Sequence, residues 1–158
     1  MDIETQFPVR MHQVVEWGDV DSFGHVNNCK YFRYYENVRL VYFEAIGLFT
    51  SVKDDSVQEC GPILARISND FKLPLFFPDR VRIDCGMRRI GRSSFNLAYR
   101  IFSETQQTIV AEADSVVVYY NYHQKVSRPL TEALLSRIRQ LEGVPSMIPP
   151  TAPPRGGP

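Results

Sequence analysis

The sequence predicts an α+β fold in which an antiparallel sheet wraps around one long, buried helix. Three observations support this prediction. Residues 30–46 carry apolar side chains at the helical period and around most of the helix circumference. Four later segments carry apolar and polar residues at the period of two that is typical of strands. The chain has 158 residues, of which 44% are hydrophobic and 12% aromatic, enough for the core of one domain.

The first expected element is a strand at residues 11–17, with Val15 and Trp17 on one face. A mostly polar stretch that includes Gly24 follows at residues 19–28 and has the composition of a turn. The chain is therefore expected to enter the helix from an irregular loop.

The helix is expected over residues 30–46. Its apolar residues recur at spacings of four and three, as in Tyr31, Tyr35, Val38, Tyr42 and Ala45. Asn27 and Asn28 are candidate N-caps, and Gly47 is expected to end the helix in a left-handed conformation.

The remaining elements are four strands and one short helix. The strands are expected to form an antiparallel meander, because only short turns separate residues 63–71, 81–89, 95–102 and 108–120. An amphipathic helix is expected at residues 131–141, before Gly143. The folded domain is therefore assigned to residues 1–143. Residues 144–158 hold six of the eleven prolines and are expected to form a flexible tail.

Composition argues against several classes of partner. Lys and Arg number 18 and Asp and Glu number 18, so no global field attracts nucleic acid. No apolar run is long enough to insert into a membrane, and residues 1–10 do not resemble a secretion signal. The three cysteines have no spacing typical of disulfides or zinc, which favours a cytoplasmic protein without a metal. Cys29 is interpreted as a small packed residue rather than a thiol nucleophile.

Residues 16–28 hold the densest group of reactive side chains. Asp19, Asp21 and His25 lie between a strand and a buried helix, whose first N–H groups can stabilise an oxyanion. A carboxylate facing such donors suits acyl transfer, either by attacking the carbonyl carbon or by deprotonating a water molecule. On residue types alone, the alternative that the aspartates form turns and the histidine is a loop residue is favoured.

A family resemblance changes that balance. Residues 9–143 resemble the hotdog-fold acyl-CoA thioesterases of the 4-hydroxybenzoyl-CoA thioesterase type. The resemblance is carried by aromatic residues of the helix, by residues 90–95, and above all by one specific run just before the helix, Asp21-x-x-Gly24-His25-Val26-Asn27-Asn28.

The resemblance implies a hotdog fold whose protomers join their sheets edge to edge, with the active sites at the interface of a homodimer or homotetramer. Asp21 matches the catalytic carboxylate, and the backbone N–H groups of Val26, Asn27 and Asn28 match the oxyanion donors. His25 matches a histidine of one branch of the family, where it positions substrate or water. No metal or redox cofactor is implied.

An arginine cluster is the second candidate site. Arg88, Arg89 and Arg92, with Ser93 and Ser94, match the region of the family that contacts the nucleotide part of coenzyme A. Guanidinium groups suit that task because their forked donors match phosphate oxygens. The alternative is a solvated strand edge that charge protects from aggregation, which fits the nearby arginines at positions 80 and 82 equally well.

The sequence therefore predicts an acyl-CoA thioesterase that releases a free acid and coenzyme A. Two alternatives remain open: a non-catalytic acyl-CoA binder or sensor, and a hotdog hydratase or dehydratase. The length of the acyl chain is not determined by the sequence.

Overall fold

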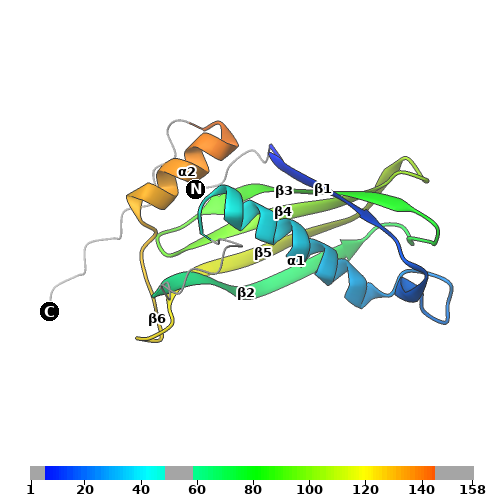
Figure 1. The fold of residues 1–158 in the computed structure, drawn as a ribbon, viewed down its shortest axis with the longest axis horizontal. Coiled ribbons are helices and arrows are strands. Elements are labelled where there is room, and N and C mark those ends of the chain that lie inside the picture. Colours follow the sequence, from blue (N-terminus) through cyan, green and yellow to red (C-terminus); the bar gives the residue numbers. More distant parts are fainter. Residues whose placement is uncertain (1–5, 49–58, 145–158) are drawn as a thin grey trace, which may run out of the picture.

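A computed structural model describes residues 6–48 and 59–144. The expected proline-rich tail lies outside the described residues, so the domain boundary stays a prediction. The chain runs through β1 (Val9–Val14), the short 3-10 helix η1 (Trp17–Asp19), α1 (Asn28–Ala45), β2 (Cys60–Phe71), β3 (Arg80–Ile90), β4 (Ser94–Ser103), β5 (Thr108–Asn121), β6 (Val126–Ser127) and α2 (Glu132–Glu142). Helix α1 lies across one face of the sheet, and α2 lies near the C-terminal end of α1 (Figure 1).

The long helix is confirmed, and it begins two residues earlier than expected. Asn27 is the N-cap, and its side chain accepts a hydrogen bond from the N–H of Cys29. Gly47 has φ +68°, the left-handed conformation expected after the last turn. The helix therefore starts directly beside the polar loop that precedes it.

The predicted meander is correct for β3, β4 and β5 and wrong for β2. All strand pairs are antiparallel, and the order is β1-β3-β4-β5-β2, with β6 pairing β5. Residues 72–79 carry the chain from β5, where Lys72 and Leu73 donate to the carbonyl of Val110, to the end of β1, where Val15 donates to the carbonyl of Asp79. This crossing places β2 at one edge of the sheet.

The expected first strand is also too long. Strand β1 ends at Val14, and the chain turns into η1 at Trp17. Val15 is fully buried, whereas Trp17 is 76% exposed, so the two side chains do not share a face as predicted. The 3-10 turn rotates Trp17 outward, which alternation along an assumed strand could not reveal.

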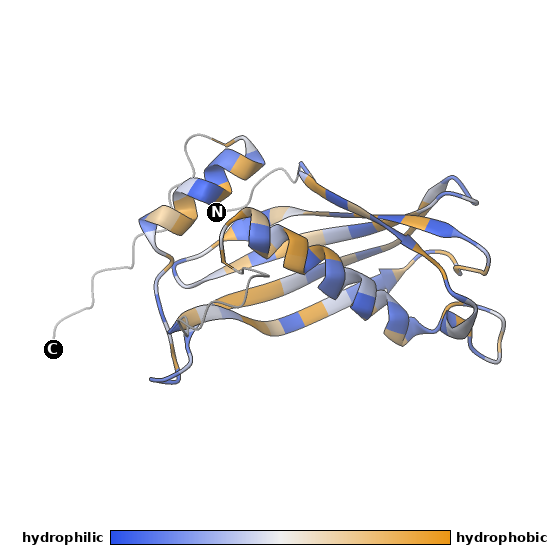
Figure 2. Cartoon of the chain, in the orientation of Figure 1, coloured by the Kyte–Doolittle hydropathy of each residue, from blue (hydrophilic) through white to orange (hydrophobic). Residues whose placement is uncertain are grey.

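The core lies between α1 and the facing side of the sheet. Along β4, fully or almost fully buried residues alternate with half-buried ones, and hydrophobic and hydrophilic residues alternate along the strands behind α1 (Figure 2). The contact across this core is aromatic: Phe43 packs edge-on against Phe95, and Tyr35 lies 5.1 Å from Tyr99 between ring centroids. Each such side chain contributes about 2 kcal/mol on burial.

Helix α2 is tied to this core by a buried carboxylate. Glu142 Oε1 accepts hydrogen bonds from the Tyr42 hydroxyl at 2.6 Å and from the Met87 N–H at 2.7 Å. Strand β1 pairs with β3 only as far as Val9 opposite Cys85, so the Met87 N–H is free to bond Glu142. Burial raises the pKa of the Glu142 carboxyl above its ordinary value.

We predict that Glu142→Gln reduces the pH dependence of stability. Because the folded pKa is raised, the folded protein holds this proton more tightly than the unfolded chain does. The wild type should therefore lose stability relative to the variant as the pH rises above the ordinary value of 4.5 and through the raised folded pKa. Urea unfolding across this range measures the difference. Glu36→Gln on the exposed face of α1 is the control, and parallel curves for wild type and Glu142→Gln would contradict the prediction.

Candidate active site

A cavity of about 380 Å³ opens at the N-terminal end of α1. Three segments form it: the loop before α1, the first turn of α1, and the end of β2 with the residues that follow. Its walls hold both predicted catalytic residues and come from Asp21, His25, Val26, Asn28, Tyr31, Phe71, Lys72, Leu73 and Pro74. The structure thus brings the carboxylate, the histidine and the helix start to one cavity.

The buried carboxylate of Asp19 fixes this loop to the helix. Oδ2 accepts hydrogen bonds from the Glu16 N–H at 3.0 Å and the Tyr34 hydroxyl at 2.8 Å. Oδ1 lies 2.9 Å from the Lys30 ammonium. Burial opposes the charge, but these three partners together hold the pKa of Asp19 below its ordinary value. Asp19 is therefore a structural anchor, as the turn interpretation expected.

Asp21 differs from Asp19 because one of its carboxylate oxygens is left for the cavity. Oδ1 accepts the N–H of Phe23 at 2.9 Å, which closes a local turn. The backbone of Asp21 bonds His25 and Gly24, and Gly24 has φ +82°, which favours glycine. Within residues 6–48 and 59–144, Oδ2 of Asp21 has no hydrogen-bond partner. The half-buried side chain is thus held by one oxygen while the other is available.

The helix start offers fewer free donors than the sequence suggested. The N–H of Val26 donates to the carbonyl of Leu75, and the N–H of Asn27 donates to that of Asp19, each at 2.8 Å. These two bonds hold the loop in place. The N–H of Asn28 has no such partner in the part of the chain that the structure describes. Of the three expected oxyanion donors, Asn28 is therefore the one available to a ligand.

Of the other reactive residues in this region, some line the cavity and one does not. His25 is exposed, and its ring lies edge-on to Phe76 with 5.6 Å between centroids. Tyr31 and Phe71 form an aromatic wall of the cavity, with their centroids 5.0 Å apart. Cys29 is exposed, so its interpretation as a packed residue is wrong, but it does not line the cavity and nothing in this geometry supports it as a nucleophile.

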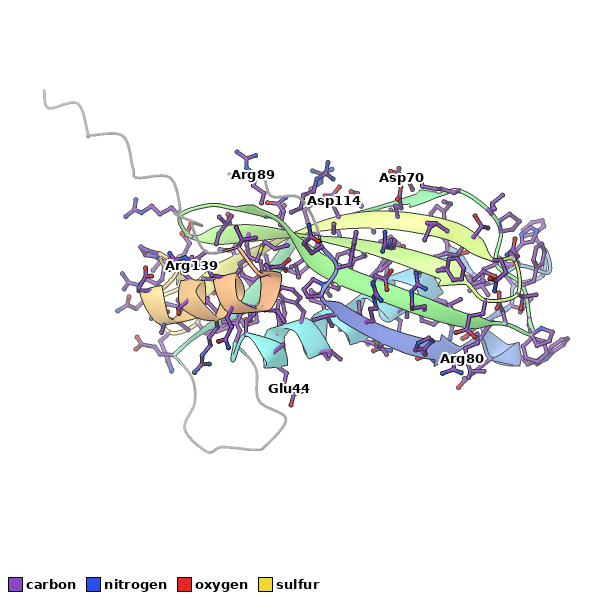
Figure 3. The ribbon with its side chains drawn as sticks, turned by 90° about the horizontal axis from the view of Figure 1, so that it is seen from above. Glu44, Asp70, Arg80, Arg89, Asp114 and Arg139 are labelled. Carbon is purple, nitrogen blue, oxygen red and sulfur yellow. The ribbon has the colours of Figure 1, made fainter. Side chains whose placement is uncertain are left out.

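The arginine cluster is spread along the whole of β3 rather than gathered in one site. Asp84 is fully buried and forms ion pairs with three arginines, Arg10, Arg82 and Arg100. Arg80 lies at the end of β3 far from Arg89 (Figure 3) and is 3.8 Å from Glu104. Arg80 and Arg82 therefore have carboxylate partners, and because β3 lies between β1 and β4 they do not form the solvated strand edge that was the alternative interpretation.

Arg88 and Arg89 lie on the face of the sheet away from α1. They line a cavity of about 290 Å³ with Asn96 and Asp114, and Figure 3 shows Arg89 and Asp114 on the same side of the sheet. This face is opposite the one that carries Asp21. Within one chain, these arginines and Asp21 do not belong to one site.

The turn that holds Arg92, Ser93 and Ser94 lies at the end of the sheet far from Asp21. The carbonyl of Arg92 accepts the N–H of Leu130, and the carbonyl of Ser93 accepts the N–H of Tyr119. The turn therefore adjoins the end of β5 and the segment that leads into α2.

A second cavity lies beside this turn, and it was not expected from the sequence. Its volume is about 400 Å³, and it lies where α1 ends, β2 begins and α2 begins, between Ile46, Gly47, Leu48, Glu59, Cys60, Tyr119, Thr131, Ala133, Leu134 and Arg137. The sequence indicated only the two helix ends that meet here, through Gly47 after the first helix and through the expected start of the second helix at residue 131.

The described residues contain no group of three or more His, Cys, Asp or Glu side chains that could hold a metal ion. None of the helices within residues 6–48 and 59–144 is long and apolar enough to cross a membrane.

Residues 15–138 match the model of a family described as the thioesterase-like superfamily. A thioesterase from Thermus thermophilus, solved in complex with coenzyme A and zinc, is 30% identical with a TM-score of 0.75, covering 89% of this chain and 98% of that one. An inferred thioesterase from Pseudomonas aeruginosa is 28% identical with a TM-score of 0.72, covering 85% and 99%. An inferred esterase of Aquifex aeolicus (strain VF5) is 25% identical over 91 residues, or 57% of this chain and 69% of its own length. The expected α+β hotdog fold is confirmed.

We predict that Asp19→Asn destabilises the protein by about 2 kcal/mol, because it weakens three bonds to a buried charged acceptor. Urea unfolding at neutral pH measures the loss. Because the folded pKa of Asp19 is lowered, the stabilisation is present above the ordinary value of 3.8 and is lost as the pH falls through the folded pKa. The deficit should therefore shrink in acid. Asp21→Asn is the matched control with near-normal stability, and equal stability of the two variants would refute the assigned anchor role.

Proposed function

The chain belongs to the thioesterase-like superfamily, and on this premise we propose that it hydrolyses the thioester of an acyl-CoA to a free acid and coenzyme A. One observation supports the proposal most directly: the available carboxylate oxygen of Asp21 and the available N–H of Asn28 belong to the same cavity. The Thermus thermophilus relative, solved with coenzyme A, supports the choice of thiol. The cavity has an aromatic wall of Tyr31 and Phe71, which suits an apolar acyl group.

Two reaction routes use these groups. In the first, Asp21 takes a proton from water while the water oxygen attacks the carbonyl carbon, and the C–S bond then breaks as the proton passes to the thiolate of coenzyme A. In the second, Asp21 attacks the carbonyl carbon and the C–S bond breaks to expel the thiolate. Water then hydrolyses the resulting anhydride to the free acid and the Asp21 carboxylate, and one proton of that water passes to the thiolate. In both, the N–H of Asn28 donates to the oxyanion. His25, on the rim, positions the substrate or the water.

We propose that a second copy of the chain completes the site. Strand β2 is an edge strand of 12 residues whose outer side no other described strand covers, and its residues Ile63 and Leu64 are 39% and 41% exposed. A long edge strand with exposed apolar residues is a template for pairing with another strand. Antiparallel pairing of two β2 strands about a two-fold axis brings the Phe71 end of one beside the Cys60 end of its partner. The Arg92, Ser93 and Ser94 turn of the partner subunit then approaches the Asp21 cavity. Arg88 and Arg89 remain proposed contacts of coenzyme A.

We expect Asp21→Asn to lower turnover by about a thousandfold and to leave acyl-CoA affinity and folding nearly unchanged, because it removes the base or nucleophile but keeps the shape. Release of the thiol is followed with a thiol-reactive dye, and binding is followed by calorimetry. Glu104→Gln, in the turn between β4 and β5 and outside both the cavity and the proposed interface, is the control. Undiminished turnover in Asp21→Asn would rule out the assigned role. Tight binding without thiol release by the wild type would indicate a sensor, and hydration of an enoyl-CoA would indicate a hydratase.

Leu64→Arg should convert the dimer to a folded monomer that has lost most of its turnover, because the added charge lies in the middle of the proposed interface. Val14→Arg is the matched control, since Val14 is 60% exposed on the opposite edge strand. Analytical ultracentrifugation gives the mass of each variant. If Leu64→Arg stays dimeric and Val14→Arg does not, β1 forms the interface and this arrangement is wrong.

A further inference from the structure

We infer that Arg137 binds a phosphate of the acyl-CoA whose thioester lies at Asp21 of the other subunit. The inference rests on the proposed hydrolysis and adds a residue to that site which no resemblance suggested. It assigns a role to the cavity at the C-terminal end of α1, which holds neither predicted catalytic residue.

Arg137 is held at a defined place in this cavity. A Cβ atom added to Gly47 would lie 1.5 Å from the nearer guanidinium nitrogen, Nη1, of Arg137. The guanidinium therefore occupies the space that a side chain at position 47 would fill, against the end of α1. A cation is favoured at this end because the last carbonyls of the helix carry partial negative charge. The position of the Arg137 guanidinium thus depends on the absence of a side chain at Gly47.

The charge of Arg137 is not neutralised by an ion pair in the described part of the chain. Arg139, two residues further along α2, pairs with Glu132 at 2.6 Å. Arg137 is exposed, lines the cavity and lies within 4 Å of no described carboxylate oxygen. Among the described residues of the cavity wall, the one acid is Glu59, which accepts a hydrogen bond from the Asn121 amide at 2.7 Å. A guanidinium without a carboxylate partner, at the mouth of a cavity, is suited to a phosphate.

The surroundings support the same ligand. Tyr119 lines the cavity and donates its N–H to the carbonyl of Ser93, and Leu130, just before Thr131, donates to the carbonyl of Arg92. The turn predicted to contact coenzyme A therefore adjoins the cavity that holds Arg137. The Thr131 hydroxyl accepts the N–H of Leu134 and donates to no acceptor within residues 6–48 and 59–144, which leaves its proton for a ligand.

The geometry favours Asp21 of one subunit and Arg137 of the other acting on the same acyl-CoA. Helix α1 has 18 residues, so its two ends are about 27 Å apart, with Asp21 beyond one end and Arg137 at the other. The two cavities also flank the two ends of β2, at Phe71 and at Cys60. In an antiparallel β2 pair, the Asp21 cavity of one subunit therefore faces the partner's Arg137. The pantetheine arm separates the thioester from the phosphates and spans between the two cavities.

The first test separates phosphate binding from a structural role. We expect Arg137→Ala to raise KM for acyl-CoA about tenfold with little change in kcat, and to leave KM unchanged for the same acyl group on N-acetylcysteamine, which has no phosphate. Arg139→Ala is the matched control and should change neither value. Gly47→Ala should act like Arg137→Ala because it displaces the guanidinium, whereas Gly143→Ala, with φ +65° and no atom within 4 Å of the added Cβ, should not. An equal rise in KM for both substrates, or no rise for acyl-CoA, would overturn the inference.

The second test asks which subunit supplies Arg137. Heterodimers of Asp21→Asn and Arg137→Ala chains are purified through two different tags and assayed below KM. If the residues act across the interface, one of the two sites is intact and the heterodimer retains about half of the wild-type rate. If they act within one chain, no site is intact and the rate stays at or below that of the Arg137→Ala dimer. Undiminished turnover by the Asp21→Asn homodimer would instead refute the role of Asp21, and a wild type that releases no thiol would refute the proposed function, which keeps these failures distinct from failure of the Arg137 assignment.

Discussion

The buried carboxylate of Asp19 is the interaction on which the functional end of the molecule depends. It joins the first turn after β1, through the Glu16 N–H, to the first two turns of α1, through Lys30 and Tyr34. Its backbone carbonyl also accepts the N–H of Asn27. One residue thus sets both the entry angle of α1 and the position of Asp21 two residues later. A buried carboxylate is suited to this task because displacing any of its hydrogen-bond donors would raise the free energy of the folded protein.

The crossing of residues 72–79 is the second constraint, and it forms the opposite wall of the same cavity. The carbonyl of Leu75 accepts the N–H of Val26, so the loop before α1 and the link after β2 are hydrogen-bonded to each other. The same crossing forces β2 to the edge of the sheet, where no described strand covers its outer side. The arrangement that builds the cavity therefore also creates the free edge that a second copy can pair with.

The sequence predicted well the features that depend on the local periodicity of apolar residues and on helix caps. The helical spacing of Tyr31, Tyr35 and Tyr42 located α1, and the run from Asp21 to Asn28 located the cavity at its start. It predicted poorly what depends on distant partners. The N–H groups of Val26 and Asn27 donate to carbonyls whose positions follow only from the fold. Strand β2 pairs with β5, which is distant in the sequence, as Asn69 opposite Ala113 illustrates. The exposure of the Trp17 side chain depends on a 3-10 turn that interrupts the alternation typical of a strand.

The arginines show why a count of charges along the sequence could not locate a phosphate site. Alternation along β3 places Arg82 on the outer face, where it shares the carboxylate of Asp84 with Arg10 and Arg100. These three arginines and Asp84 together carry a net positive charge, but the guanidinium donors are already directed at Asp84. Two of the guanidinium groups also stack on aromatic rings. Arg137 stands apart in sequence from this cluster, yet it lies in a cavity without a carboxylate partner among the described residues. A cation is available to a ligand because of what surrounds it, and this follows from helix packing rather than from charge density along the chain.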